Sequence, residues 1–512
     1  MREIVAIVKN SRLMDMGLDQ LETLKKGRDR ILRTGNAAVY VRSVYKVDGV
    51  LYCIGRDAKG KHFYQMSLTR IRSRFSGEAK YLQGLYCLEV PMTQRNMRAL
   101  WKVFPFTQPV SLRDRRTTIG MGDRLGLATA GQLRAARKYN LSPVLAQQSI
   151  RELDLTGRTF EDVIADASFL VFQEGYEGGY GADGDHLKNL AGIKRALNAG
   201  MPMITLDLTE VMKPEVAGWD QRQVHEAFKK IRRDDQVRIR RDYASKTFRI
   251  GRNSVTVSLE EAEKCAVMYG PALDFAQKVD KFLKSKRGTE YDLEISIDET
   301  TTPTLPAHHL FIARELQVRG VSVTSIAPRF VGEFQKAIDY IGHIRDFDRQ
   351  FSVHCDIARA HGNYKVSIHS GSDKFAVYPT IGKHTEKHVH LKTSGTSWLV
   401  ALEVVARNNP ALYRKLHQKA IEFFPEAAKL YHVNVDIEKL KPLEKVRDRE
   451  LLDYLVDPNG RQLMHITYGG ILMDAELRAE LFAALHQNEE AYAVALEKHF
   501  DKHIQLLGIE RV

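Results

Sequence analysis

The chain has 512 residues and is 44% apolar, with 35 glycines and 15 prolines, so a large buried core is expected and a wholly disordered or fibrous protein is excluded. Its net charge of +13 comes from 77 basic and 64 acidic residues, a small excess for this length. Much of the excess lies in residues 229–241, which we interpret as a solvated face of an inserted element, because no recognisable nucleic-acid module lies beside it.

The first hundred residues predict a separate α/β cap, residues 1–108. Residues 39–45 and 50–54 alternate as strands do, and Asp48-Gly49 between them is typical of a hairpin turn.

From residue 109 onward, short apolar segments end in polar, glycine-rich corners and alternate with helical stretches. The expected strands are residues 117–120, 143–146, 169–172, 202–207, 291–298, 321–326, 364–369, 389–392 and 462–466, and two of the helices are residues 128–138 and 187–198. Strands that alternate with helices indicate parallel βα units, and about eight in series favour a closed barrel. We therefore predict a TIM-like (β/α)8 barrel over residues 109–480.

Two further segments complete the expected organisation. Residues 214–288 are too long for a simple βα connection and are read as an inserted subdomain with a hairpin near residues 246–257. Residues 481–512 are expected to form a helical segment packed on the barrel.

The four cysteines, Cys53, Cys87, Cys265 and Cys355, are widely spaced and form no CxxC motif, so neither a zinc site nor a disulfide framework is expected. They are typical of reduced thiols in a cytoplasmic protein. The N-terminal apolar stretch is too short for a signal peptide, and no apolar run reaches the roughly 18 residues of a membrane span. We expect neither a membrane nor a nucleic acid as a partner.

Polar side chains gather where the expected strands end, which in a parallel βα barrel is the edge that carries the chemistry. They are Asp123, Arg124, Asp183, Asp185, His186, Asp298, Glu299, Arg329, His369, Lys374, His390, Lys392 and Tyr468.

Several of these residues are candidate metal ligands. A single histidine at a strand end is more often a hydrogen-bonded structural residue, but His186, His369 and His390 would converge with Asp298 and Glu299 on one rim. Imidazole and carboxylate without thiolate suit zinc, manganese, nickel or cobalt. We therefore expect a divalent metal ion, with Asp298 and Glu299 serving as ligand and base in either order.

The remaining candidates would bind substrate or move protons. Asp185 precedes the predicted helix 187–198, so it could be an N-cap, a proton-transfer base, or both. Small residues after His369 would let backbone amides approach an oxygen-rich ligand, and Lys374 adds a positive charge. The segment 393–397 fits either a cradle for substrate hydroxyls or a helix cap. The expected substrate-binding residues are Asp123, Arg124, Asp183, Arg329, Ser370, Ser372, Asp373, Lys374, Thr393 and Tyr468.

Several stretches together resemble the tagaturonate/fructuronate epimerase family. They are residues 118–126 (TIGMGDRLG), 181–188 (GADGDHLK), 296–300 (SIDET), 328–332 (PRFVG), 367–375 (SIHSGSDKF) and 392–397 (KTSGTS), of which 367–375 is the most specific. The resemblance covers residues 117–475. It implies a divalent metal ion and inversion of C4 of a 2-keto hexuronate.

Some proteins similar to this family interconvert the neutral sugars fructose and tagatose, so the resemblance leaves two substrate classes open. Crowding of Asp123, Asp183 and Asp185 favours neutral hydroxyls, whereas Arg124 and Arg329 favour a carboxylate. On the acidic crowding, we expect appreciable activity on neutral fructose and tagatose, with Asp123 reading the C6 end.

C4 of a 2-ketose is not next to the carbonyl, so its hydrogen is not acidic. A retro-aldol reaction solves this: a metal holds the C2 carbonyl and C3 hydroxyl oxygens, a base takes the C4 hydroxyl proton, the C3–C4 bond opens, and the aldehyde half turns before the bond re-forms. Asp185 and Glu299 are the expected proton-transfer pair, with Lys392 or Lys374 as oxyanion partner.

Two alternatives remain from the sequence. One is another metal-dependent ketose isomerase or aldolase, which product analysis would separate. The other is a non-catalytic RNA- or sugar-binding protein that uses the basic residues 229–241, which a steep salt dependence would reveal. The oligomeric state is open, a homo-oligomer included.

Overall fold

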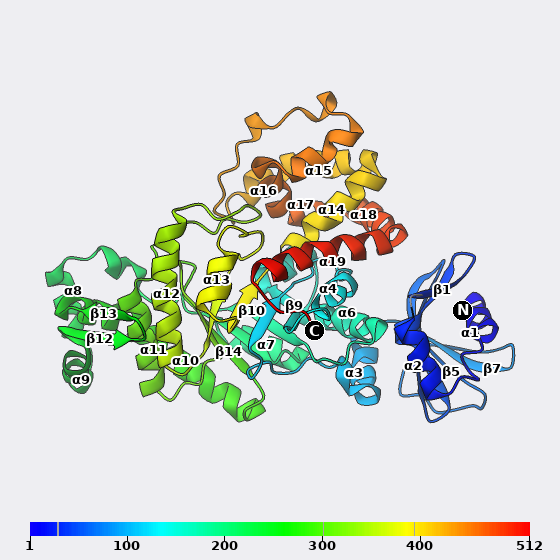
Figure 1. Ribbon diagram of the computed structural model, residues 1–512, viewed down its shortest axis with the longest axis horizontal. Coiled ribbons are helices and arrows are strands. Elements are labelled where there is room, and N and C mark those ends of the chain that lie inside the picture. Colours follow the sequence, from blue (N-terminus) through cyan, green and yellow to red (C-terminus); the bar gives the residue numbers. More distant parts are fainter. Residues whose placement is uncertain (28–29, 301, 394) are drawn as a thin grey trace. The chain divides into compact units, whose positions relative to one another are not determined.

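The computed structural model describes residues 1–27, 30–300, 302–393 and 395–512. The chain packs into two compact units, one of Met1–Pro109 with Glu161–Gly179 and one of Val110–Phe160 with Tyr180–Val512 (Figure 1). The division at residues 108, 480 and 214–288 stays a prediction. No helix within the described residues is long and apolar enough to cross a membrane.

A seven-stranded antiparallel sheet forms the first unit, in the order β1-β2-β4-β5-β7-β6 with β3 paired to β4. The predicted hairpin is β3–β4, in which Asp48 and Gly49 adopt φ of 50° and 76°, as a two-residue turn of this kind requires. The strands are β1 Ile31–Thr34, β2 Ala37–Tyr40, β3 Tyr45–Val47, β4 Val50–Asp57, β5 Gly60–Ser67, β6 Glu78–Leu82 and β7 Leu85–Val90, and the helices are α1 Arg2–Asn10, α2 Leu18–Lys26, α3 Gln94–Val103 and α6 Phe160–Glu174.

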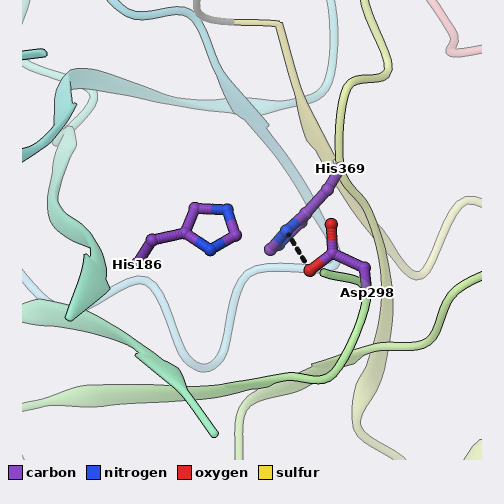
Figure 2. A group of neighbouring side chains, drawn as sticks. All are labelled: His186, Asp298 and His369. Atoms are coloured by element: carbon purple, nitrogen blue, oxygen red, sulfur yellow. Dashed lines mark ion pairs between the residues drawn. The ribbon is translucent and has the colours of Figure 1, made fainter. Parts of the chain in front are cut away.

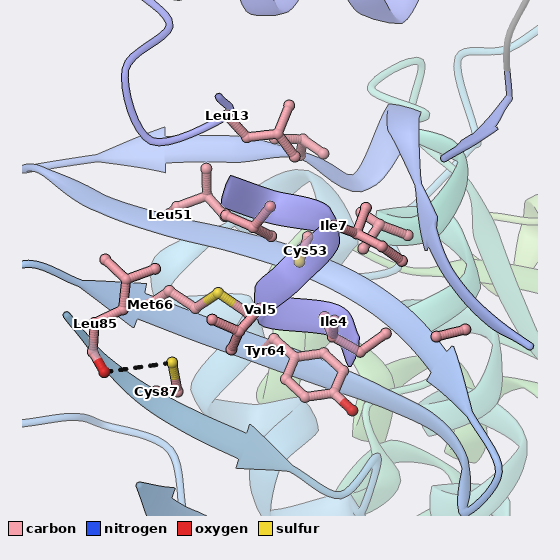
Figure 3. Packing of buried hydrophobic residues seen from close by; sticks show 14 of the residues in the cluster. Ile4, Val5, Ile7, Leu13, Leu51, Cys53, Tyr64, Met66, Leu85 and Cys87 are labelled. Atoms are coloured by element: carbon pink, nitrogen blue, oxygen red, sulfur yellow. Dashed lines mark hydrogen bonds between the residues drawn. The ribbon is translucent and has the colours of Figure 1, made fainter. Parts of the chain in front are cut away.

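The apolar face of α1 covers one side of this sheet. Ile4, Val5 and Val8 recur at helical spacing and are fully buried in the same cluster as Leu51 and Tyr64 of the sheet. Figure 3 shows Ile4 and Val5 on the side of α1 that faces the sheet. Burial of this stripe is what holds the short helix α1 in place, since nine residues are too few for a stable isolated helix.

The second unit contains a closed barrel of eight parallel strands, which confirms the predicted TIM-like (β/α)8 fold. The neighbours around the barrel are β10-β11-β14-β15-β16-β17-β8-β9. The strands are β8 Thr117–Gly120, β9 Ser142–Ser149, β10 Gly181–Leu187, β11 Met203–Asp207, β14 Asp292–Ser296, β15 Ser325–Ala327, β16 Lys365–Ile368 and β17 Val389–Lys392.

Two predicted strands are wrong. Residues 169–172 lie inside the helix α6, and residues 462–466 lie inside α16 Pro458–Ile466. A short apolar run does not distinguish a buried helix from a buried strand, and both segments are buried.

Among the barrel strands, β10 was not predicted. Its inward side chains are Asp183 and Asp185, so it lacks the apolar alternation of a strand and was read as a corner. The helix after it begins later than expected, as α7 Leu190–Ala199, and its N-cap is Asn189, whose side chain accepts from Gly192 N at 3.0 Å. The N-cap interpretation of Asp185 is therefore wrong.

Helices follow the strands of the second unit. They are α4 Thr129–Ala136, α5 Ile150–Thr156, α7, α10 Leu259–Arg287, α11 Pro306–Val318, α12 Ile344–Ala360, α13 Tyr378–His384, α14 Thr396–Asn408, α15 Pro410–Ala427, α16, α17 Tyr468–Met473, α18 Ala475–Gln487 and α19 Glu489–Leu506. Residues 214–288 hold α8 Gln221–Phe228, α9 Arg233–Tyr243, the predicted hairpin β12 Lys246–Ile250 with β13 Asn253–Val257, and α10. Helices α14–α18 lie together, and α19 packs against α4 and α14 (Figure 1).

Candidate active site

A cavity of about 250 Å³ lies at the carboxyl ends of the barrel strands. Strand ends β10, β16 and β17 contribute Asp185, His369 and Lys392, so this is the edge at which chemistry is expected in such a fold. Of the sequence-predicted site residues, the cavity wall includes Arg124, Asp185, His186, Asp298, Glu299, Arg329, His369, Ser370, Ser372 and Lys392.

His186, Asp298 and His369 form a group in which one ligand-type atom of each lies within 4.8 Å of the others (Figure 2). His369 Nδ1 lies 3.0 Å from Asp298 Oδ1, and the two imidazole centroids are 4.9 Å apart. The structure thus brings together three of the five predicted metal ligands, each from a different strand end.

A distortion of β10 makes this possible. The pairing register shifts between Gly184 and Leu187, and His186 adopts a φ of 49°. In a regular strand, Asp185 and His186 would point to opposite faces, but this irregularity lets both line the cavity.

A second group shares His186. It joins His186, Asp207 and Glu299 within 4.8 Å, with His186 Nδ1 at 3.5 Å from Asp207 Oδ2. Glu299, the fourth predicted ligand, is exposed, whereas Asp207 at the end of β11 is buried and was not predicted. Burial would lower the pKa of His186, but Asp185, Asp207, Asp298 and Glu299 outweigh it and raise that pKa to about 10.

Glu294, which the sequence analysis missed, orients His369. Its Oε1 lies 2.6 Å from His369 Nε2, and because an ionised carboxylate only accepts, Nε2 donates to it. Burial would raise the pKa of Glu294, but Lys392 and His369 hold it well below its usual range. Nδ1 is the atom that faces Asp298, so Glu294 fixes the imidazole for ligation.

Lys392 lies beneath this group among carboxylates. Its Nζ is 2.9 Å from Asp183 Oδ2, 2.7 Å from Asp185 Oδ1 and 2.9 Å from Glu294 Oε1, and it also donates to Thr205 Oγ1. Burial would lower the pKa of Lys392, yet the three carboxylates raise it well above its ordinary value.

The two aspartates beside Lys392 respond in opposite directions. Burial raises the pKa of Asp183 to about 6. Burial acts on Asp185 in the same way, but the charge of Lys392 outweighs it and holds the pKa of Asp185 below its ordinary value. Asp185 lines the cavity as an ionised carboxylate, whereas Asp183 is buried below and bonds Thr205 N at 3.1 Å.

His390, the fifth predicted ligand, does not join the metal-type groups found among the described residues. It shares the inward face of β17 with Lys392 but lies two residues before it, about 6–7 Å deeper along the strand. Its Nδ1 bonds Thr118 Oγ1 at 2.9 Å, and burial lowers the pKa of His390 to about 3, so the imidazole is neutral.

Asp123 is placed away from the cavity wall. Its carboxylate accepts from the backbone N–H groups of Leu125, Gly126 and Ala128, at 3.0, 2.9 and 2.6 Å. These contacts pin the corner after β8. Because Asp123 and Asp183 both lie outside the wall, the acidic crowding that favoured neutral sugars loses two of its three residues.

Lys374 and Asp373 likewise do not line the cavity; their side chains hold neighbouring segments in place. Lys374 Nζ donates to the backbone carbonyls of Gln335, Ile338 and Ser372, at 2.8, 2.6 and 2.9 Å. Burial lowers the pKa of Lys374 to about 7. Asp373 Oδ2 accepts from Arg461 at 2.6 Å.

Asp373 also belongs to a third group of ligand-type residues, with His499 and His503. Three ring nitrogens of these two histidines already make hydrogen bonds. His503 Nδ1 bonds His499 O at 2.8 Å, His503 Nε2 accepts from Asp373 N at 3.2 Å, and His499 Nε2 bonds Thr396 Oγ1 at 2.9 Å. We therefore interpret this group as a set of hydrogen bonds that holds α19 in place.

Two other residues predicted to bind substrate, Thr393 and Tyr468, contact other protein groups instead. Thr393 donates its hydroxyl to Gly120 O at 2.8 Å, and the neighbouring Ser394 of the predicted cradle lies outside the described residues. Tyr468 is buried, in a helix instead of at a strand end, and its ring stacks under the Arg124 guanidinium at 3.7 Å. Arg124 in turn pairs with Glu152 at 3.0 Å.

Several residues of the cavity wall were missed. Gln147 and Ser149 lie in β9, which runs three residues beyond its predicted end, and Arg151 and Glu152 lie in the first turn of α5 directly after it, so a longer predicted strand would have revealed them. Others, among them Lys336, Tyr431 and His432, come from segments with no strand signal, and His465 lies in the segment wrongly predicted to be a strand, which is helix α16.

The comparisons with known proteins agree with this geometry. A family model described as UxaE, tagaturonate epimerase, matches residues 40–507. This chain belongs to that family. It is 36% identical over 469 residues to the tagaturonate/fructuronate epimerase of Thermotoga maritima, covering 92% of this chain and 96% of that protein.

Solved structures give the same result. Native fructuronate-tagaturonate epimerase UxaE from Cohnella laeviribosi matches with a TM-score of 0.89 and 39% identity, over 96% of this chain and 99% of that one. A glycerol complex of the same enzyme matches with a TM-score of 0.88 and 40% identity, over 92% and 96% of the two chains. The chain is thus an epimerase, an isomerase that acts on sugars, and the non-catalytic alternative is excluded.

Proposed function

We propose that this epimerase interconverts tagaturonate and fructuronate by inverting C4 of the 2-keto hexuronate, with a divalent metal ion held by His186, Asp298 and His369. The observation that carries the proposal is the convergence of these three side chains in the cavity of a chain whose relatives bear that name. Glu299 and Asp207, grouped with His186, are the further candidate ligands.

The residues present fit a metal ion. His186 Nδ1 and Asp207 Oδ2 are buried, lie 3.5 Å apart and make no hydrogen bond among the described residues. A buried polar atom without a partner costs about 1–3 kcal/mol, and ligation would supply one. Imidazole with carboxylate suits zinc, manganese, nickel or cobalt. When bound, such an ion would act as a Lewis acid toward the substrate oxygens beside the bond that breaks.

Protein side chains would carry the protons. A retro-aldol path removes the C4 hydroxyl proton as the C3–C4 bond breaks, the bonding pair passes to C3 and is delocalised onto the C2 oxygen, and the aldehyde turns before the bond re-forms. Glu299 has no ion pair among the described residues and is exposed, so it is free to take and return that proton.

Asp185 would serve the opposite aldehyde orientation. Lys392 lies 2.7 Å from it and keeps it ionised, so that it can accept a hydrogen bond from a substrate hydroxyl. Through Asp185, the charge of Lys392 also reaches the reacting oxygens.

Metal removal tests the cofactor. The purified chain should contain a divalent metal, lose fructuronate-to-tagaturonate conversion on chelation, and regain it when zinc, manganese, nickel or cobalt is returned. His369→Ala should lose both metal and activity, whereas His390→Gln, outside the group, should keep its metal. Full metal content and full activity in His369→Ala would refute the site.

Heavy water tests the path. A retro-aldol reaction moves a hydroxyl proton and leaves the hydrogen on C4 in place, so product formed in deuterated water should carry no deuterium at C4. Deuterium there, measured by NMR, would mean direct deprotonation of C4. An aldolase or aldose–ketose isomerase, the other activities open from the sequence, would instead release trioses or yield an aldose.

A further inference from the structure

Three cationic side chains on the cavity wall lack an ion pair among the described residues. They are Arg151, Arg329 and Lys336, none of which lies within ion-pair distance of a carboxylate in the part of the chain that the structure describes. Arg124, on the same wall, is already paired with Glu152. The cavity thus presents unneutralised positive charge as well as the carboxylate and imidazole groups described above.

Lys336 is the best placed of the three. It lies in the segment between β15 and α12, and its Nζ donates to Ser370 Oγ at 2.7 Å. Ser370 follows His369 directly and adopts a φ of 48°, which turns the chain at this point. The ammonium therefore contacts the residue that directly follows His369, a member of the metal-type group.

Arg151 lines the same cavity as Lys336. Burial lowers the pKa of Lys336, and the charge of Arg151 lowers it further; Glu152, Glu299 and Asp298 act in the opposite direction without outweighing them. Two like charges over one cavity repel each other, and at Lys336 the nearby carboxylates do not fully offset this. A bound carboxylate would supply further negative charge.

We propose that Lys336 and Arg151 bind the C6 carboxylate of the substrate, with Ser370 beside it, and so select a hexuronate over a neutral ketohexose. The inference rests on the proposed function, because it assigns an orientation to the same substrate: C2 and C3 at the His186, Asp298 and His369 group, C6 at Lys336. An arginine fork and an ammonium are well suited to a carboxylate.

The backbone around Lys336 is held in a way that supports binding. Lys374 bonds the carbonyls of Gln335 and Ile338 on either side, and Gln462 donates to Lys336 O at 3.2 Å. Arg461 donates to Ala337 O at 2.8 Å. A charge carried on so constrained a loop loses little entropy on binding. Lys374 is accordingly a positioning residue for Lys336.

Steady-state kinetics on fructuronate and on fructose test the proposal, with Lys336→Met removing the charge and Lys336→Arg keeping it. The loss of a charge-assisted hydrogen bond should raise the KM for fructuronate about tenfold or more, with a smaller effect on kcat. The ratio of kcat/KM for fructuronate over fructose should fall by a similar factor, and Lys336→Arg should restore most of it.

Arg151→Met is the second variant and should act in the same direction, which keeps the test decisive if Lys336→Met does not fold. An unchanged KM for fructuronate in folded Lys336→Met, or a loss confined to kcat, would overturn the inference while leaving the epimerase activity intact. A wild-type enzyme that converts no fructuronate would instead overturn the proposed function.

Discussion

Two lysines of the same cavity lie in opposite electrostatic surroundings. Lys392 contacts Asp183, Asp185 and Glu294, and although burial opposes it, these carboxylates raise its pKa well above the ordinary value. Burial lowers the pKa of Lys336, and Arg151 adds to that effect. The comparison indicates that carboxylates of the protein already pair with the charge of Lys392, whereas the charge of Lys336 has no ion pair among the described residues.

The largest effect is expected when Lys392 is replaced. Lys392→Met would leave three buried carboxylates without their cation, which typically costs about 3–5 kcal/mol of unfolding free energy. Turnover of fructuronate should fall by at least about a hundredfold, because the charge behind Asp185 is lost. Denaturant unfolding and kinetics measure the two losses.

Lys365 provides the matched control. It is a buried lysine of the same barrel, at the start of β16, outside the cavity, and its Nζ donates to Leu112 O at 3.1 Å. Lys365→Met should cost stability but keep the turnover of the folded enzyme. Equal losses of turnover in both variants would show that Lys392 acts only through folding.

The two lysines also show what sequence patterns can reveal. Lys392 ends an apolar strand, so the barrel prediction placed it on the active edge. Lys336 follows no strand and lies in a segment without hydrophobic periodicity, where position depends on contacts with distant residues such as Lys374, Arg461 and Gln462. Only tertiary structure brings it into the cavity.

The same limit applies to other parts of the site. Strand β10 was hidden because Asp183 and Asp185 replace the apolar residues that identify a strand. Glu294 was passed over because it lies in the middle of β14, away from the strand end. His186, Asp298 and His369 were found because they stand where chemistry is expected in this fold.

A substitution of Asp123 provides a second test of the role of Lys336. The sequence analysis expected Asp123 to contact the C6 end of the substrate, whereas the structure leads us to assign that contact to Lys336. Asp123→Ser should lower the unfolding free energy by about 2 kcal/mol, because the buried carboxylate accepts three backbone hydrogen bonds. It should leave the preference for fructuronate over fructose unchanged. Asp123→Asn, which keeps one acceptor oxygen, should lose less stability. If folded Asp123→Ser changes the preference for fructuronate over fructose, then Asp123, not Lys336, contacts the C6 end of the substrate.

The smallest expected effect concerns His417, whose pKa is lowered by burial alone. Burial is also the main cause that lowers the pKa of Lys336. His417 lies in α15 against Tyr413 and Tyr454, with ring centroids 5.8 and 4.5 Å away, and burial lowers its pKa to about 4. In the unfolded chain, the value is near the ordinary 6.5. Between these two values the unfolded state binds more protons, so stability present above the higher value is lost as the pH falls toward the lower one.

Between about pH 7 and about pH 5.5, this site should cost the wild type roughly 1 kcal/mol of unfolding free energy. His417→Phe removes the titration while preserving an aromatic ring, so its unfolding free energy should fall about 1 kcal/mol less than that of the wild type over the same interval. His432→Gln is the control, because its exposed side chain meets water in both states. If the unfolding free energy falls equally in the wild type and in His417→Phe, then burial shifts the pKa of this imidazole little. Burial would then also be a weaker reason for the lowered pKa of Lys336.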